Sequence, residues 1–146
     1  MKNRILVLAA HPDDEVLGCG GTIKKLSSEG CVVKTVFFSD GESARISKKN
    51  IENKILNRRK NAKKAAKILG YNKQDFLNYP DNKFYSVDYL ELIKVIEQKI
   101  VEFKPDKIFT HFYDDLNVDH CLISKATTTA CRPAKFKFVK ELFFFH

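Results

Sequence analysis

Residues 5–15 read Ile-Leu-Val-Leu-Ala-Ala-His-Pro-Asp-Asp-Glu, six apolar residues followed at once by a histidine, a proline and three acids. A continuous apolar run of this length is typical of a β-strand that is buried on both faces, and Pro12 stops it. Strands covered on both faces occur mainly in parallel sheets. The stretch therefore predicts a parallel strand with a polar cluster directly at its carboxyl end.

The rest of the chain alternates apolar runs with segments of helical periodicity. Glycines at 18, 20 and 21 are expected to interrupt or delay the first helix, Gly30 to close it, and Gly70 to cap the second. Helices that alternate with strands predict an α/β fold, a Rossmann-like and mostly parallel sheet with helices on both faces. The expected strands are 5–10, 32–38, 75–79, 107–110 and 138–145, and the expected helices are 16–26, 51–69, 89–103 and 122–133.

Length and composition indicate one globular domain over residues 1–146. An apolar fraction of 44% excludes a disordered tail. The net charge of +8 comes mostly from lysines within 48–67 and 135–140, spaced as on solvated helix faces, so no nucleic-acid partner is expected. Four cysteines without a C-x-x-C pair favour reduced thiols and a cytoplasmic location, and no apolar run approaches the roughly 18 residues of a transmembrane span.

Polar residues follow each of the first four expected strands, at 11–15, 39–42, 79–82 and 111–120. The carboxyl ends of parallel strands lie at one edge of a sheet, so these loops are expected to converge on one crevice.

Histidines and carboxylates in these loops can form a metal site. His11, Asp13 and Asp14 lie within four residues, and His120 follows Asp119 in a different loop. Two imidazoles and one carboxylate form a three-ligand site with an open position for water, as in catalytic zinc centres. The second carboxylate can then act as the base for that water. This chemistry is hydrolysis without a nucleophilic side chain.

Simpler interpretations of the same residues stay open. The acids at 13–15 suit the first turn of a helix, whose dipole favours negative charge, and His111 can simply bond loop backbone. The glycines at 18–21 follow the first strand too late for a dinucleotide loop and do not form G-x-G-x-x-G, so tight helix packing is expected instead. A serine or cysteine hydrolase has no support, because no G-x-S-x-G motif and no strand-end cysteine occur.

Residues 10–15, Ala-His-Pro-Asp-Asp-Glu, with the glycines that follow, resemble the opening motif of the PIG-L/LmbE-like deacetylase family. The resemblance continues in Asn57-Arg58-Arg59 with 65–70, in Tyr79-Pro80-Asp81-Asn82, and in 110–111, 115–120 and 129–133. It covers nearly the whole chain, although family members generally continue beyond the segment matching its last strand.

The resemblance implies zinc-dependent N-deacetylation of an N-acetylglucosamine-type sugar or glycoconjugate. It implies that His11, Asp14 and His120 bind zinc, that Asp13 activates water, and that Asp119 supports the site electrostatically. The alternative is a noncatalytic metal- or sugar-binding member of the family.

Further site residues are expected beside these. Many family members carry a histidine where this chain has Asn117, which can donate a hydrogen bond but cannot titrate, and His111 is expected to replace that histidine in part. Substrate contacts are expected from Arg58 or Arg59 with Asp81 and Asn82. The apolar end of the chain, Phe143-Phe144-Phe145, predicts a homo-oligomer that covers the last strand.

Overall fold

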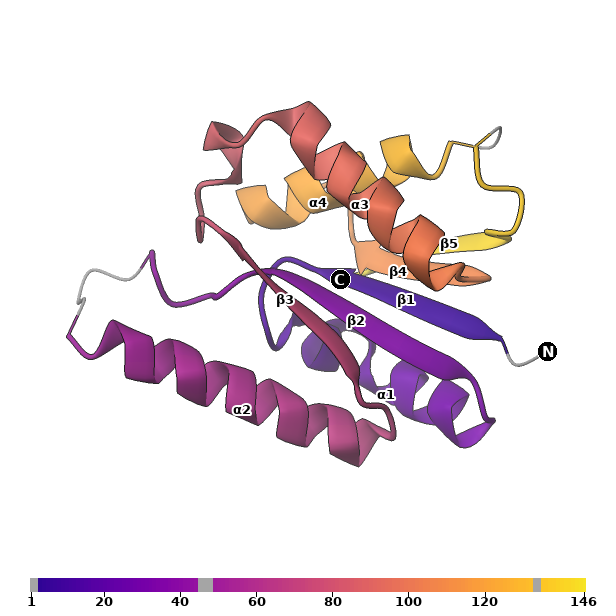
Figure 1. Cartoon of the computed structure of the whole chain (residues 1–146), viewed down its shortest axis with the longest axis horizontal. Helices are drawn as coiled ribbons and strands as arrows, with labels where there is room; N and C mark the ends of the chain where they lie inside the picture. Colours follow the sequence, from indigo (N-terminus) through magenta and orange to yellow (C-terminus); the bar gives the residue numbers. More distant parts are fainter. Residues whose placement is uncertain (1–2, 45–48, 133–134) are drawn as a thin grey trace.

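A computed structural model describes residues 3–44, 49–132 and 135–146. Its centre is a five-stranded sheet in the order β3-β2-β1-β4-β5, in which every neighbouring pair is parallel (Figure 1). The expected α/β fold with a parallel sheet is confirmed. The strands are β1 (Arg4–Ala9), β2 (Val32–Ser39), β3 (Lys73–Tyr79), β4 (Lys107–His111) and β5 (Glu141–Phe145).

Helices cover both faces of the sheet (Figure 1). α1 (Asp14–Ser28) and α2 (Ile51–Leu69) lie on one face, and α3 (Tyr89–Phe103) and α4 (Val118–Ala130) lie on the other. A short 3-10 helix, η1 (Phe84–Ser86), precedes α3.

The alternating side chains of β1 divide the core into two layers. Leu6 and Leu8 pack in the apolar cluster that contains residues of α3 and α4, whereas Ile5 and Val7 pack in the cluster with residues of α1 and α2. All four are fully buried. Burial on both faces explains the unbroken apolar run of this strand and its central place in the sheet.

The first helix differs in detail from the expectation. α1 begins at Asp14, directly after the strand-end loop, and so it is not delayed. It is interrupted, as expected, at Cys19 between Gly18 and Gly20, where the φ of −142° is non-helical. A Cβ at Gly18 would overlap the ring of Phe145, so glycine at this position permits close approach of α1 and β5. This confirms tight packing as the reason for a glycine here.

Three other boundaries differ from those expected. β3 begins at Lys73, opposite Lys34, although its first residues are polar. β5 begins only at Glu141, since Val139 lies in a turn and donates its N–H to the carbonyl of Phe136. α4 begins at Val118 and ends at Ala130, and the expected helix end near Pro133 lies outside the described residues.

None of the helices that the structure describes combines the length and the apolar character that a membrane crossing needs.

Candidate metal centre

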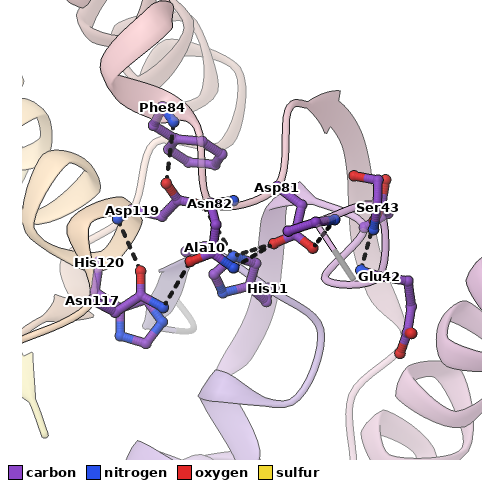
Figure 2. Close-up of polar contacts among 12 residues, drawn as sticks. Ala10, His11, Glu42, Ser43, Asp81, Asn82, Phe84, Asn117, Asp119 and His120 are labelled. Atoms are coloured by element: carbon purple, nitrogen blue, oxygen red, sulfur yellow. Dashed lines mark hydrogen bonds and ion pairs between the residues drawn. The ribbon is translucent and has the colours of Figure 1, made fainter. Parts of the chain in front are cut away.

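Side chains that follow or end the strands β1, β3 and β4 meet at the carboxyl edge of the sheet, as the topology predicts. His11 follows β1, Asp81 follows β3, His111 ends β4, and Asp119 lies in the first turn of α4. Figure 2 shows Asp81 and Asp119 directed toward the imidazole of His11 from two different segments.

Asp14 is at the centre of the histidines. Its Oδ2 lies 3.5 Å from Nδ1 of His11, 3.4 Å from Nε2 of His120 and 3.4 Å from Nε2 of His111. The ligand atoms of His11, Asp14 and His120 all lie within 4.8 Å of one another. We call these three residues the ligand cluster. Ligands of a tetrahedral zinc ion lie about 3.3 Å apart when each bond is about 2.0 Å long, so these separations fit one divalent cation.

Carboxylates orient both histidines of the ligand cluster. Nδ1 of His120 lies 3.0 Å from Asp115 Oδ2, and Nε2 of His11 lies 3.2 Å from both Asp119 Oδ2 and Asp81 Oδ1. A carboxylate on one ring nitrogen fixes the tautomer and leaves the lone pair of the other nitrogen for a metal. The remaining nitrogens, His11 Nδ1 and His120 Nε2, are those that face Asp14.

The Nε2 atom of His120 supplies a separate test of this fit. It is buried, and no hydrogen-bond partner satisfies it within the described part of the chain. Buried polar atoms in proteins are normally hydrogen-bonded, so an imidazole nitrogen without a hydrogen bond and 3.4 Å from the carboxylate of Asp14 is suited to bind a metal. The residues present therefore fit a bound cation.

The electrostatics also favour positive charge at this point. Burial alone lowers the pKa of His11, but the surrounding carboxylates of Asp119, Asp14 and Asp81 outweigh it and raise the pKa to about 11. Burial raises the pKa of Asp14, yet the three histidines around it outweigh that effect and hold the pKa below its usual range. A proton on His11 and a metal ion would satisfy the same negative environment.

His111 lies beside the ligand cluster but has a partner of its own. The backbone N–H of Ala10 donates to Nε2 of His111 at 2.9 Å, and the ring stacks on His120 with centroids 3.9 Å apart. Burial lowers the pKa of His111. The simple interpretation, a strand-end histidine that bonds backbone, describes this contact, and an accepting Nε2 leaves the ring proton on Nδ1.

Asp119 is completely buried and organises the neighbouring loop. Its Oδ2 accepts the backbone N–H of Asn82 at 2.7 Å, and its Oδ1 accepts that of Phe84 at 3.1 Å (Figure 2). The same Oδ2 contacts His11. Asp119 therefore joins the 80–84 segment to the ligand cluster.

Replacing Asp119 with alanine is expected to destabilise the protein by about 3 kcal/mol, because two backbone N–H groups and one imidazole lose their acceptor. Urea denaturation of the metal-free protein measures this change. A loss below about 0.5 kcal/mol would show that water replaces these bonds.

Asn117 lies at the start of α4 and acts there as a helix cap. Its Oδ1 accepts the backbone N–H of Asp119 at 2.9 Å, and its Nδ2 is 3.5 Å from Oδ1 of Asn82. A capping asparagine explains why α4 begins four residues before the apolar pattern predicts.

Asp13, the residue before Asp14 of the ligand cluster, contacts α2 through its side chain. Its Oδ2 accepts a hydrogen bond from Nη2 of Arg58 at 2.7 Å. The same guanidinium donates hydrogen bonds to the carbonyl of Pro12 at 3.1 Å and to Oε1 of Glu42 at 2.9 Å. Asp13 makes no side-chain capping bond to α1, so a simple N-cap does not explain it. Its carboxylate is 51% exposed and so remains accessible to water.

Two cavities meet at Leu17. The larger, about 570 Å³, lies between α1 and α2 and is lined by Asp13 and Arg58. The smaller, about 160 Å³, contains Asp14, His111 and His120. Leu17 lines both.

The four residues expected to contact substrate differ in their surroundings; they are Arg58, Arg59, Asp81 and Asn82. Arg58 lines the larger cavity, and Asn82 has an exposed side chain near Asn117. Asp81 is buried, and its two oxygens are used by His11 and by the backbone N–H of Ala44. Both oxygens of this carboxylate are thus paired within the protein, and one of them contacts His11.

Arg59 also lies apart from the other expected contacts. Its Nη2 donates to Oδ1 of Asn78 at 2.7 Å, and its guanidinium lies over the ring of Phe76, 5.5 Å from the centroid. Arg58 therefore lies at the larger cavity, whereas the neighbouring Arg59 contacts β3.

Sequence reasoning missed two acids with clear contacts in this site. Asp115 orients His120, and Glu15, fully buried, accepts the backbone N–H of Asp13 at 3.2 Å. Burial raises the pKa of Glu15 to about 7. Both lie within stretches already singled out, but only the fold shows what each carboxylate contacts.

Asp115→Asn is expected to weaken zinc binding by about 10- to 100-fold, because the orienting carboxylate of His120 loses its charge. Competition with a chromogenic chelator measures the affinity. Asp114→Asn, a change in the exposed neighbouring carboxylate, is the matched control and should leave the affinity unchanged. Equal effects of the two variants would contradict an orienting role.

Comparisons with known proteins identify the family of the chain. Residues 6–131 match the family model described as PIG-L, GlcNAc-PI de-N-acetylase. A Bacillus cereus protein named "Probable N-acetyl-alpha-D-glucosaminyl L-malate deacetylase 2" is 32% identical over 138 residues, which covers 89% of this chain and 61% of that protein.

Two solved structures are similar over most of the chain. The N,N'-diacetylchitobiose deacetylase of Pyrococcus horikoshii has a TM-score of 0.80 and 27% identity, covering 94% of this chain and 52% of that one. GalB, the 4-carboxy-2-hydroxymuconate hydratase of Pseudomonas putida, has a TM-score of 0.76 and 26% identity, covering 89% and 55%.

The chain thus spans 52% to 61% of the length of these three relatives. The family model nevertheless extends over both motifs that form the site, from the end of β1 to α4. This chain belongs to the PIG-L family of GlcNAc-PI de-N-acetylase-like proteins.

Proposed function

We propose that this protein is a zinc-dependent hydrolase that removes the acetyl group from an N-acetylglucosamine-type sugar or glycoconjugate. The observation that carries the proposal is the ligand cluster, in which carboxylates orient both histidines so that their free nitrogens face Asp14. Relatives named as deacetylases of acetylated amino sugars support the substrate class.

In this proposal His11, Asp14 and His120 hold the cation, and Asp13 transfers the proton of the attacking water. A bound divalent cation supplies Lewis acidity toward the amide carbonyl and the attacking water. Asp13 accepts the proton of that water as it attacks, and then returns it to the departing amine. Arg58 holds the Asp13 carboxylate in the lining of the larger cavity during both transfers.

Neighbouring donors complete the proposed site. Asn117 remains a proposed donor to the developing oxyanion through Nδ2, and His111 through its protonated Nδ1. Asp119 acts on the site through His11. The sugar is proposed to occupy the cavity of about 570 Å³ with Arg58 and Asn82 as contacts, its acetamido group reaching past Leu17 toward Asp14.

Acetate release tests this function. The protein, stripped of metal and reloaded with one equivalent of zinc, is incubated with N-acetylglucosamine, diacetylchitobiose and N-acetylglucosaminyl malate. We expect acetate release from at least one of them that depends on zinc. Zinc bound with no acetate from any of these would favour the alternative, a noncatalytic metal- or sugar-binding member of the family.

A second candidate reaction is hydration of a carbon–carbon double bond, which the likeness to GalB favours. Both reactions require an activated water, so the ligand cluster alone does not separate them. Loss of the ultraviolet absorbance of a 2-hydroxymuconate-type diene, without acetate release from the sugars, would identify the hydratase.

Location and assembly remain proposals. All four cysteines are free, in keeping with a reducing cytoplasm. β5 forms an edge of the sheet and leaves Phe143 and Phe144 about two-fifths exposed, so we retain the prediction that a second copy covers it. Light scattering at micromolar concentration should then show more than one chain per particle, and a monomer would contradict it.

A further inference from the structure

Glu15 carries a fully buried carboxyl group whose side-chain hydrogen bonds go to Asp13 and Tyr71. Oε2 accepts the backbone N–H of Asp13 at 3.2 Å, and Oε1 accepts the hydroxyl of Tyr71 at 3.4 Å. Burying a carboxyl group with two neutral donors costs stability, whereas an apolar side chain at this position would not. This loss of stability indicates that the carboxyl group of Glu15 has a function of its own.

The backbone that Glu15 holds is strained. Asp13 has a φ of +142°, a conformation that side chains other than glycine rarely adopt. Such a conformation costs about 1–3 kcal/mol and persists only where its surroundings impose it. The peptide of Asp13 therefore needs contacts on more than one side.

Several contacts hold this conformation. The carbonyl of Asp13 accepts the backbone N–H groups of Val16 and Leu17, each at 3.0 Å. Arg58 binds the Asp13 carboxylate and the preceding carbonyl of Pro12 from α2, and Glu15 binds the Asp13 N–H from within α1. The ion pair with Arg58 directs the side chain, and the bond to Glu15 sets the plane of the peptide from which that side chain projects.

Tyr71 fixes Glu15 from a different part of the fold. It is buried in the connection between α2 and β3, and its hydroxyl oxygen also accepts a hydrogen bond from Nε2 of Gln74 at 3.4 Å. Gln74 donates in addition to the carbonyl of Ala62 in α2 at 3.1 Å. The chain of contacts from Asp13 therefore ends on two rigid elements, α2 and β3.

We propose that Glu15, held by Tyr71, is a positioning residue that keeps the strained Asp13 backbone in the conformation that presents its carboxylate to water. This inference rests on the proposed role of Asp13 as the base. Glu15 acts only through Asp13, and the ligand cluster does not depend on it.

Three variants test the inference in the zinc-loaded protein. Glu15→Ala is expected to lower kcat for acetate release by about 10- to 100-fold, since displacement of a catalytic group by about 1 Å has effects of that size. KM and zinc affinity should stay within about twofold of the parent. Glu15→Gln should restore most of the activity, because the amide oxygen still accepts the Asp13 N–H and the amide nitrogen can donate to Tyr71.

Tyr71→Phe keeps the test valid if Glu15→Ala does not fold, and should lower kcat by about 3- to 10-fold through the loss of one hydrogen bond. In an Asp13→Asn background, Glu15→Ala should cause no further loss, because its effect passes through the Asp13 carboxylate. Additive losses in the double variant, a raised KM or a weakened zinc site would overturn the positioning role.

A crystal structure of Glu15→Ala separates this inference from the proposed function. We expect φ of Asp13 to leave the positive region and the Asp13–Arg58 ion pair to break, whatever the activity of the parent. An unchanged Asp13 would overturn the inference, whereas a parent without acetate release would overturn the proposed function alone.

Discussion

Replacing His120 with alanine is expected to abolish stoichiometric zinc binding. Two ligands remain, and Asp14 loses the partner that lies 3.4 Å from its Oδ2. The loss of affinity should exceed the roughly 100-fold that changes in outer residues cause. The fold should survive, because His120 lies at the start of α4 with a partly exposed side chain.

Metal content after dialysis and competition with a chelator measure this effect, with Asp114→Asn as the control variant. Retention of one zinc per chain by His120→Ala would exclude His120 as a ligand. Loss of zinc from the control as well would indicate adventitious binding to surface carboxylates.

Asp13→Asn is expected to lower kcat by about 10²- to 10⁴-fold while one zinc per chain remains bound. The amide keeps the shape of the side chain but cannot accept a proton from water. Its oxygen can still accept the hydrogen bond from Arg58, so the loop should keep its position. Steady-state kinetics and metal analysis on the same sample separate the two effects.

A second variant, Arg58→Lys, tests whether the guanidinium positions Asp13. The three bonds of the guanidinium to Asp13, Pro12 and Glu42 need its forked shape, which lysine lacks. We expect a lower kcat with zinc retained. Parallel loss of zinc and activity in Asp13→Asn would mean that Asp13, and not Asp14 alone, holds the metal.

Much of this fold follows from local patterns. The short apolar runs at the start of the chain and at 32–38 are typical of strands buried on both faces of a parallel sheet. Gly70 ends α2 with a φ of +92°, as its position predicts. The convergence of His11, Asp14 and His120 follows in turn, because parallel strands bring their carboxyl ends to one edge.

What the sequence does not contain is the direction of each side chain. Arg58 and Arg59 are adjacent, yet about 100° of helical rotation sends one to Asp13 and the other to Asn78. Arg58 lies four residues before Ala62 and seven before Ala65, so the three residues share one face of α2 and line the same cavity. This spacing is the sequence signal that distinguishes Arg58 from Arg59.

Burial of polar groups depends on contacts between distant segments. Asp81 follows β3 in an ordinary turn sequence, and only His11 and the N–H of Ala44 make it an internal carboxylate. The same holds for His111, whose Nε2 is occupied by the N–H of Ala10 in the neighbouring strand segment. Tertiary contacts, rather than residue type, decide which polar side chains in these loops are free.

The most direct test of the central claim is anomalous diffraction at the zinc absorption edge from crystals of the zinc-loaded protein. We expect one strong peak within coordination distance of His11 Nδ1, Asp14 Oδ2 and His120 Nε2, with Asp81, Asp115 and Asp119 still bonded to the histidines. A peak held instead by Asp81 and Asp119, or no peak at the carboxyl edge of the sheet, would contradict it.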